Sequence, residues 1–280
     1  MAGVKQKTPM HKGFTIIEVM IFLAISGVTF LIAATFINGK QAQAEFTTGM
    51  NSSNSVIRSM INSVADGNYP ISSTTPLSCS IVSPGFPQIY RTNVPSSPGC
   101  TFIGKVLAPE TNRNPGIYSI YSVVGCQFYV SNTCTSSQGM PPATLTQEHP
   151  TVALPITQSN NWPGGLSISK LLLINGANVQ SIGAFGVFST LPQNSGSVLV
   201  SGAQATEAVI INNSQLVSDS DSNIAGLVSN STTWLPSGAY ILMCFTDTNG
   251  HFGSITVGGV NAGGQLNTTL QMGAARAAQC

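Results

Sequence analysis

A long uninterrupted apolar run near the amino terminus constrains this chain more than any other feature. Residues 14–37 read FTIIEVMIFLAISGVTFLIAATFI, and about 20 apolar residues suffice for a helix that crosses a bilayer. Lys5, Lys7 and Lys12 precede the run, whereas only Lys40 follows it closely. Because positively charged residues favour the cytoplasmic side, we expect the amino terminus inside and the rest of the chain exported.

Glu18 is an acid inside this apolar run. An unpaired ionisable group at membrane depth costs a few kcal/mol. A cut between Gly13 and Phe14 would create an amino group about 6 Å along the helix axis from Glu18, one turn away. A carboxylate in the first turn also stabilises a helix amino terminus. Such a cut would therefore supply Glu18 with the partner that it lacks.

These residues also carry a family resemblance. Lys12-Gly13 followed by Phe14-Thr15-Ile16-Ile17-Glu18-Val19-Met20 resembles the processing and methylation site of type IV prepilins and pseudopilins. The resemblance implies that a prepilin peptidase cuts after Gly13 and methylates the amine of Phe14, and that Glu18 acts in assembly. Gly27 agrees with many members, whereas Thr35 stands where many have proline. The resemblance covers about the first 40 residues.

The same resemblance implies a function. The chain would be a structural subunit, a pilin or minor pilin, of a type IV pilus or related filament used in adhesion or motility, and not an enzyme. Its partners would be other pilin subunits, the prepilin peptidase, the inner-membrane platform and the assembly ATPase. It would cross the cytoplasmic membrane once before assembly and lie in an extracellular filament afterwards. A pseudopilin of a type II secretion or DNA-uptake system is an alternative.

A conventional signal peptide is a further alternative. Ala42-Gln43-Ala44 is a site that signal peptidase could cut, which would release a Sec-secreted β-rich binding protein that begins at Glu45. The apolar run is longer than the roughly 7 to 15 residues usual in signal peptides, and Glu18 has no role in that reading. A permanent, unprocessed anchor explains neither Gly13 nor Glu18.

Helical periodicity continues beyond the apolar run. Apolar residues recur at three- and four-residue steps, which predicts one buried stripe on a helix that ends near Asp66-Gly67; they are Phe46, Met50, Ile57, Met60 or Ile61, and Val64. The expected fold is α+β and pilin-like, with a long amino-terminal helix, transmembrane in its first half, packed against an antiparallel β-sheet head.

In the rest of the chain, short apolar runs are separated by Gly, Pro, Ser and Asn, a pattern that indicates strands joined by turns. We expect a leader peptide (1–13), a transmembrane or filament-core helix (14–38), the outer half of the long helix (39–67), a loop-rich insertion with disulfides (68–165) and an antiparallel β head (166–280). Long strands look scarce in residues 71–165. Expected strands are 116–124, 127–130, 169–174, 181–189, 197–200, 207–211, 239–246 and 251–257, the last two joined by a hairpin at Asp247-Thr248-Asn249-Gly250.

All six cysteines lie in the exported part, and an even number outside the cytoplasm indicates disulfides. Six cysteines allow 15 pairings. Proximity along the chain favours Cys79 with Cys100, Cys126 with Cys134, and Cys244 with Cys280. The third pair corresponds to the carboxyl-terminal loop disulfide of many pilins that the chain resembles. Zinc is disfavoured because no C-x2-C pair is present and no histidine is spaced near the cysteines.

Composition excludes several other functions. Charged residues make up only 7% of the 280 residues and the formal net charge is +1, so the scattered cations do not predict nucleic-acid binding. No cofactor is expected, and no G-x-S-x-G motif indicates a hydrolase. Asp219, Asp221 and Asn223 resemble the opening of a calcium loop, but Ile224 takes the glycine position, so a polar turn is favoured over calcium.

Overall fold

The structure is a computed structural model that describes residues 15–66, 77–82, 86–91, 100–110, 114–131, 133–135, 139–140, 144–189, 206–211, 228, 232–260, 266–273 and 280. The chain divides into two compact units, Met1–Glu45 and Phe46–Cys280. Helix α1 (Ile16–Ala65) begins in the first unit and ends in the second. Each unit is described by itself.

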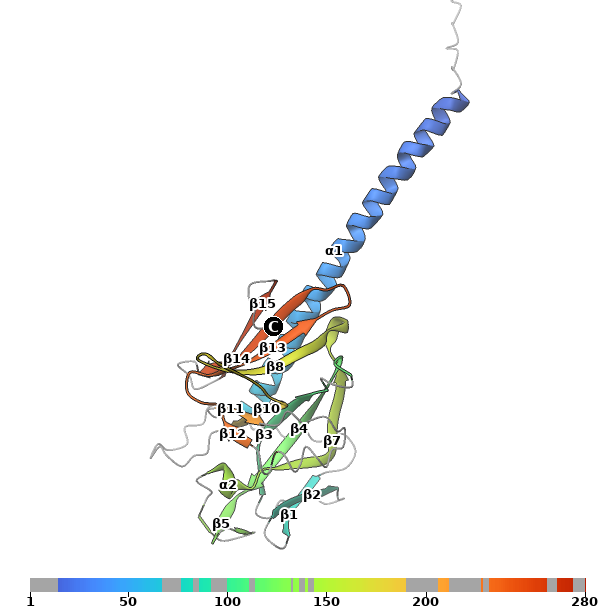
Figure 1. Cartoon of the computed structure of the whole chain (residues 1–280). Coiled ribbons are helices and arrows are strands. Elements are labelled where there is room, and N and C mark those ends of the chain that lie inside the picture. Colours follow the sequence, from blue (N-terminus) through green and yellow to red (C-terminus); the bar gives the residue numbers. More distant parts are fainter. Residues whose placement is uncertain are drawn as a thin grey trace, which may run out of the picture. The chain divides into compact units, whose positions relative to one another are not determined.

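Beyond α1, the second unit is built mainly of strands (Figure 1). In chain order they are β1 (Leu77–Val82), β2 (Phe86–Arg91), β3 (Cys100–Pro109), β4 (Ile117–Cys126), β5 (Phe128–Val130), β6 (Thr133–Thr135), β7 (Thr151–Asn161), β8 (Ser167–Asn175), β9 (Asn178–Ser181), β10 (Ala184–Ser189), β11 (Thr206–Ile211), β12 (Thr232–Trp234), β13 (Tyr240–Thr246), β14 (Phe252–Val260) and β15 (Leu266–Met272). A short helix α2 (Leu145–Glu148) precedes β7, and a 3-10 turn (Pro163–Gly165) follows it.

These strands form two large sheets and two small ones. The six-stranded sheet has the order β12-β11-β10-β3-β4-β7, and the five-stranded sheet has the order β15-β14-β13-β8-β9. Among the described strands, β1-β2 and β5-β6 form separate two-stranded sheets. Every pairing among the described strands is antiparallel. The expected α+β class, a long apolar helix with antiparallel sheets, is confirmed.

The outer part of α1 packs against both large sheets. The predicted apolar stripe is confirmed, since Phe46, Met50, Ile57, Met60, Ile61 and Val64 are all buried. They share one core cluster with residues of the six-stranded sheet, such as Phe185, and of the five-stranded sheet, such as Met243. Burial of apolar surface is the main stabilising contribution to such a core.

Both large sheets are also buried on their second face. On β8, Leu171 and Leu173 belong to the cluster around α1, whereas Leu172 and Ile174 belong to a separate cluster. Side chains alternate between the two faces of a strand, so burial on both faces needs a continuous apolar run. This explains why β8 and β13 have no apolar-polar alternation.

Close approaches at glycine fix the helix against the sheet. A Cβ added at Gly253 of β14 would lie 2.7 Å from Cε of Met50 and 3.1 Å from Cζ of Phe46. On the same helix, Arg58 donates from Nε to Oγ1 of Thr268 on β15 at 2.8 Å. Close packing at Gly253 and the hydrogen bond between Arg58 and Thr268 thus set the position of this part of α1 on the five-stranded sheet.

The expectation that residues 71–165 hold few long strands is wrong. β3, β4 and β7 are ten, ten and eleven residues long and provide half of the six-stranded sheet. That sheet therefore takes strands from both sides of residue 165. Strands expected at 116–124, 127–130, 169–174, 207–211, 239–246 and 251–257 are present within a few residues, with the expected hairpin between β13 and β14.

Two other strand predictions differ from the structure. The strand expected at 181–189 is two strands of different sheets, because β9 belongs to the five-stranded sheet and β10 to the six-stranded one. The chain crosses between them at Ile182 and Gly183, whose N–H groups donate to Leu171 O and to Ile211 O respectively. The strand expected at 197–200 lies outside the described residues, and β15 was not expected.

Among the described residues, two disulfides are present, Cys126–Cys134 and Cys244–Cys280, with Cα–Cα distances of 5.5 and 5.6 Å. They are two of the three pairs expected from proximity. The first joins the end of β4 to β6, and the second ties residue 280 to the central strand β13. The third expected pair, Cys79 with Cys100, stays a prediction because the side chain of Cys79 lies outside the described residues.

Candidate assembly site at the amino terminus

The first turn of α1 holds a reciprocal pair of hydrogen bonds between Thr15 and Glu18. The N–H of Thr15 donates to Oε2 of Glu18 at 2.9 Å, and the N–H of Glu18 donates to Oγ1 of Thr15 at 3.3 Å. The Thr15 hydroxyl also donates to Oε2 at 3.0 Å. This is a capping box, which satisfies backbone donors that the start of a helix leaves without partners.

Glu18 therefore has hydrogen-bond partners in the uncut chain. Cleavage is therefore not needed to give Glu18 its first partner, contrary to the expectation from sequence. The signal for the capping box is a threonine three residues before a glutamate at the start of an apolar run, and it can be read from Thr15-Ile16-Ile17-Glu18. What the box does not supply is a positive charge, which a new amine at Phe14 would provide.

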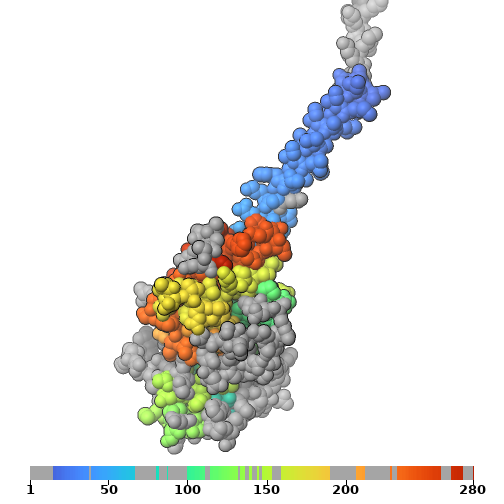
Figure 2. All heavy atoms as spheres, viewed as in Figure 1, coloured from blue at the N-terminus to red at the C-terminus, as the bar shows by residue number. Residues whose placement is uncertain are grey.

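The first unit exposes almost all of its apolar side chains. Ile16, Phe30 and Phe36 are 81, 73 and 67% exposed, and Figure 2 shows the side chains of this segment in blue along its surface. By length and composition α1 is a candidate membrane span, with a mean hydropathy of 2.5 in its most apolar window, none of which is buried. This apolar helix is consistent with membrane anchoring, since lipid or other helices can cover such a surface.

Two threonine hydroxyls inside the apolar run are satisfied by the helix itself. Thr29 donates to the carbonyls of Ile25 and Ser26, both at 3.0 Å, and Thr35 donates to Ile32 O at 2.9 Å. Such bonds allow hydroxyl side chains to lie in an apolar environment without leaving a donor free. The sequence between residues 15 and 39 contains one side chain that carries a charge, that of Glu18.

The residues of the two predicted cleavage sites differ in whether the structure describes them. Gly13 and Phe14 lie outside the described residues. The alternative cleavage site, Ala42-Gln43-Ala44, lies within the helical backbone of α1. Lys40 lies over the ring of Phe36, with Nζ 5.7 Å from the ring centroid.

The metal sites considered from sequence have no support in the described part of the chain. Asp219, Asp221 and Asn223 lie outside it. No group of three or more His, Cys, Asp or Glu side chains that could hold a metal ion occurs among the described residues. His251 instead pairs with Asp247, Nδ1 to Oδ2 at 2.6 Å, in the β13–β14 hairpin.

Asp247 organises that hairpin. Its Oδ1 accepts hydrogen bonds from the N–H groups of Asn249 and His251, at 2.9 and 2.8 Å. Burial raises the pKa of Asp247, but the hydrogen bonds and charge of His251 and the N–H of Asn249 outweigh it, so the pKa is lowered overall. The arrangement is a turn held by its own side chains.

Glu148 is a buried acid that the sequence analysis did not single out. It ends α2, is only 1% exposed, and its Oε1 has no hydrogen-bond partner within the part of the chain that the structure describes. Burial raises its pKa from 4.5 to about 8. Gly125 packs closely against this residue, since a Cβ added there would lie 2.9 Å from Glu148 O and 3.3 Å from Glu148 Cβ.

Comparison with known proteins gives one match, at the amino terminus. Residues 9–34 match the model of the prokaryotic N-terminal methylation motif, and the matched span contains Gly13, Phe14 and Glu18. The chain is thus type IV pilin-like in two respects, the motif and the long apolar helix with antiparallel sheets. Neither the search of curated proteins nor that of solved structures gave a match.

Proposed function

We propose that the chain is a structural subunit, a pilin or minor pilin, of a type IV pilus or a related filament, and not an enzyme. The observation that best supports this is the N-terminal methylation motif at residues 9–34, at the start of an apolar helix capped through Glu18. In this proposal a prepilin peptidase cuts after Gly13 and methylates Phe14. The inner-membrane platform and the assembly ATPase then add the subunit to other pilin subunits.

The apolar surface of α1 explains how a subunit could leave the membrane. Before assembly, lipid would cover side chains such as Phe22 and Phe30, which are 70 and 73% exposed in the isolated chain. In a filament, the same side chains would pack against helices of neighbouring subunits. The exchange keeps apolar surface out of water, so it costs little hydrophobic free energy. The lysines before the run would keep the amino terminus in the cytoplasm until cleavage.

Glu18 would act as a register check in this assembly. Its carboxylate keeps the capping bonds to Thr15 and would also pair with a Phe14 amine, either of its own chain or of an adjacent subunit. A subunit out of register would leave a charge unpaired among apolar helices, and breaking a buried pair in this way costs about 3 to 5 kcal/mol. The proposed role therefore depends on the charge of Glu18 and not on its capping bonds alone.

Two alternatives use other parts of the chain. A pseudopilin of a type II secretion or DNA-uptake system would share the same amino-terminal chemistry, so the distinction depends on the filament that the subunit joins. A Sec-secreted binding protein would be cut after Ala44 and would lose Glu18 altogether. Its cleavage site lies within α1, which does not favour it, because the helix would have to open there.

The mature amino terminus tests the proposal directly. Intact mass and terminal peptide sequencing of the protein from its native host should give N-methylated Phe14. Gly13→Val should block maturation and leave full-length precursor in the membrane, because a branched side chain crowds the peptidase site, whereas Gly13→Ala should be processed almost normally. Glu45 at the terminus, or normal processing of the Val variant, would rule out the prepilin route.

Substitutions at Glu18 separate its two roles. Glu18→Ala should still be processed but should assemble poorly when no wild-type subunit is present. Glu18→Gln keeps an oxygen that can accept from Thr15 and loses only the charge, so we expect it to assemble as poorly as Glu18→Ala. Filament yield by electron microscopy, with precursor and mature protein followed by immunoblot, measures both. Normal filaments from the Gln variant would show that Glu18 acts through capping and not through its charge.

A further inference from the structure

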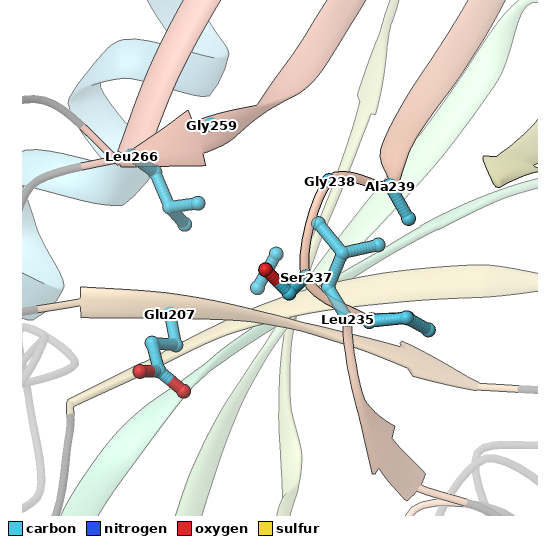
Figure 3. Close-up of a pocket in the computed structure, with 9 residues that line it drawn as sticks. Glu207, Leu235, Ser237, Gly238, Ala239, Gly259 and Leu266 are labelled. Atoms are coloured by element: carbon cyan, nitrogen blue, oxygen red, sulfur yellow. The ribbon is translucent and has the colours of Figure 1, made fainter. Parts of the chain in front are cut away.

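One cavity lies where strands of the two large sheets come together (Figure 3), and a second adjoins it along the five-stranded sheet. The larger has a volume of about 350 Å³ and lies between β11, the turn that leads into β13, and the ends of β14 and β15. The smaller, of about 290 Å³, lies along β13, β14 and β15. Both are lined by Gly238, Ala239 and Gly259, so we treat them as one two-part cleft.

Two glycines in turns, Gly238 and Gly259, leave backbone peptide groups exposed to the cleft. Gly238 and Gly259 have φ angles of 77° and 73°, and nothing lies within 4 Å of a Cβ added at either position. Gly259 belongs to a β-bulge, because the pairing of β14 with β15 shifts between Val257 and Val260. A bulge removes backbone groups from the hydrogen-bond ladder. The cleft therefore presents peptide groups that a ligand can reach without meeting a side chain.

The cleft carries little charge. Among the described residues that line its two parts, Glu207 is the only one with an ionisable acid or base at neutral pH. Glu207 shares a face of β11 with Val209 and Ile211, which belong to a different cluster from Ala208. Figure 3 shows its carboxylate turned away from Ser237 and Leu266. Neither an anion nor a cation would find a counter-charge inside.

The remaining lining combines hydroxyl groups with apolar carbon. Ser237 and Leu266 approach the space from opposite sides, and Leu235 adds further apolar surface. Thr256 and Thr269 line the smaller part of the cleft and add two further hydroxyl groups. The cleft thus suits a ligand with neutral hydroxyl groups and an apolar C–H face.

We infer that this cleft binds a neutral saccharide of one or two sugar units. The two volumes lie near the lower end of the range of about 300 to 1,000 Å³ for small-molecule sites, which limits the ligand to that size. Sugar hydroxyls would pair with Ser237, the glycine peptide groups and the hydroxyls of Thr256 and Thr269. The C–H face would pack on Leu235 and Leu266. This site does not depend on the filament role, because it belongs entirely to the second unit.

The test uses the full-length chain in detergent micelles, probed with an array of neutral mono- and disaccharides, inorganic phosphate and methylammonium. Saturable binding of at least one neutral saccharide is expected, and neither ion should bind. Ser237 is exposed, so Ser237→Trp can fill the cleft without disturbing the core, and it should weaken binding by at least about tenfold. Asn178→Trp, on exposed strand β9, is the matched control and should bind like the wild type, as should Glu207→Gln.

Each other outcome contradicts the inference. If no neutral saccharide binds, or if Ser237→Trp and Asn178→Trp bind equally well, the cleft is not a saccharide site. If methylammonium binds and Glu207→Gln abolishes its binding, the cleft recognises a cation instead. A thermal unfolding curve for each variant shows that a loss of binding is not a loss of fold.

Discussion

Replacing Glu148 by glutamine should raise the free energy of unfolding by about 4 kcal/mol at pH 8 and change it little near pH 4. The folded state holds this buried acid protonated up to a pKa of about 8, whereas the unfolded chain releases the proton near its ordinary value of 4.5. Between these two values the folded state binds one proton more than the unfolded state. Stability therefore falls as pH rises through this window, by at most about 1.4 kcal/mol per pH unit.

Denaturant unfolding of the full-length chain in micelles, at pH values from 4 to 9, measures this slope. Glu148→Gln is nearly the same size and cannot ionise, so its curve should lack the decrease between pH 4.5 and 8. Glu207→Gln, at an exposed acid, is the matched control and should keep it. A wild-type slope that persists in Glu148→Gln would show that another group causes it.

Adding a single methyl group at Gly104 should destabilise the second unit by about 3 kcal/mol. Gly104 lies directly opposite Phe188 in the pairing of β3 with β10, at a β-bulge of β3. A Cβ there would overlap the carbonyl oxygen of Val187 and the ring of Phe188, and would lie 2.8 Å from Phe188 Cα. Backbone atoms cannot move aside without breaking strand pairing, and overpacking of this kind typically costs about 1 to 3 kcal/mol or more.

The matched control is Gly116→Ala, which also adds one methyl group. The nearest atoms to a Cβ at Gly116 are Asn114 Oδ1 at 3.5 Å and Leu166 O at 3.8 Å, which are ordinary contacts. The free energy of unfolding of this variant should lie within about 0.5 kcal/mol of the wild-type value. Equal stability of the two variants in denaturant would mean that β3 and β10 do not pack as described.

The helix could be predicted from sequence because a single physical pattern governs it. One face of its outer half is buried, so apolar residues recur at helical spacing from Phe46 to Val64, and all of the predicted stripe residues are buried. The amino-terminal motif could be recognised for a similar reason, since Gly13, Phe14 and Glu18 lie next to one another along the chain. The capping box is also formed by residues close together in the chain, Thr15 and Glu18, so its pattern can be recognised in the sequence as well.

Strands β3 and β7 could not be predicted because tertiary pairing outweighs their local composition. β3 contains Gly104 and Lys105 and ends at Pro109, all residues that are uncommon in strands, yet it lies between β4 and β10. β7 contains Pro155, which donates no backbone hydrogen bond. It is tolerated because β7 is an edge strand whose pairing with β4 shifts between Tyr121 and Val123.

The cleft and the buried acid could not be predicted because each depends on contacts between distant parts of the chain. Glu148 lies in a polar stretch of sequence, and only its burial beside Gly125 makes it unusual. Similarly, Gly258 and Gly259 look like an ordinary turn in sequence. Only the structure shows that they form a bulge beside the turn that contains Gly238.

The Cys244–Cys280 disulfide has a mechanical consequence. It closes a covalent ring that spans 36 residues and contains β14 and β15. If a filament is pulled, tension that travels along the chain past Cys244 takes the shorter route through the sulfur atoms. The cross-link holds the two ends of this segment together, with Cα atoms 5.6 Å apart, so a pull on the chain outside the ring cannot draw out the backbone between the two cysteines.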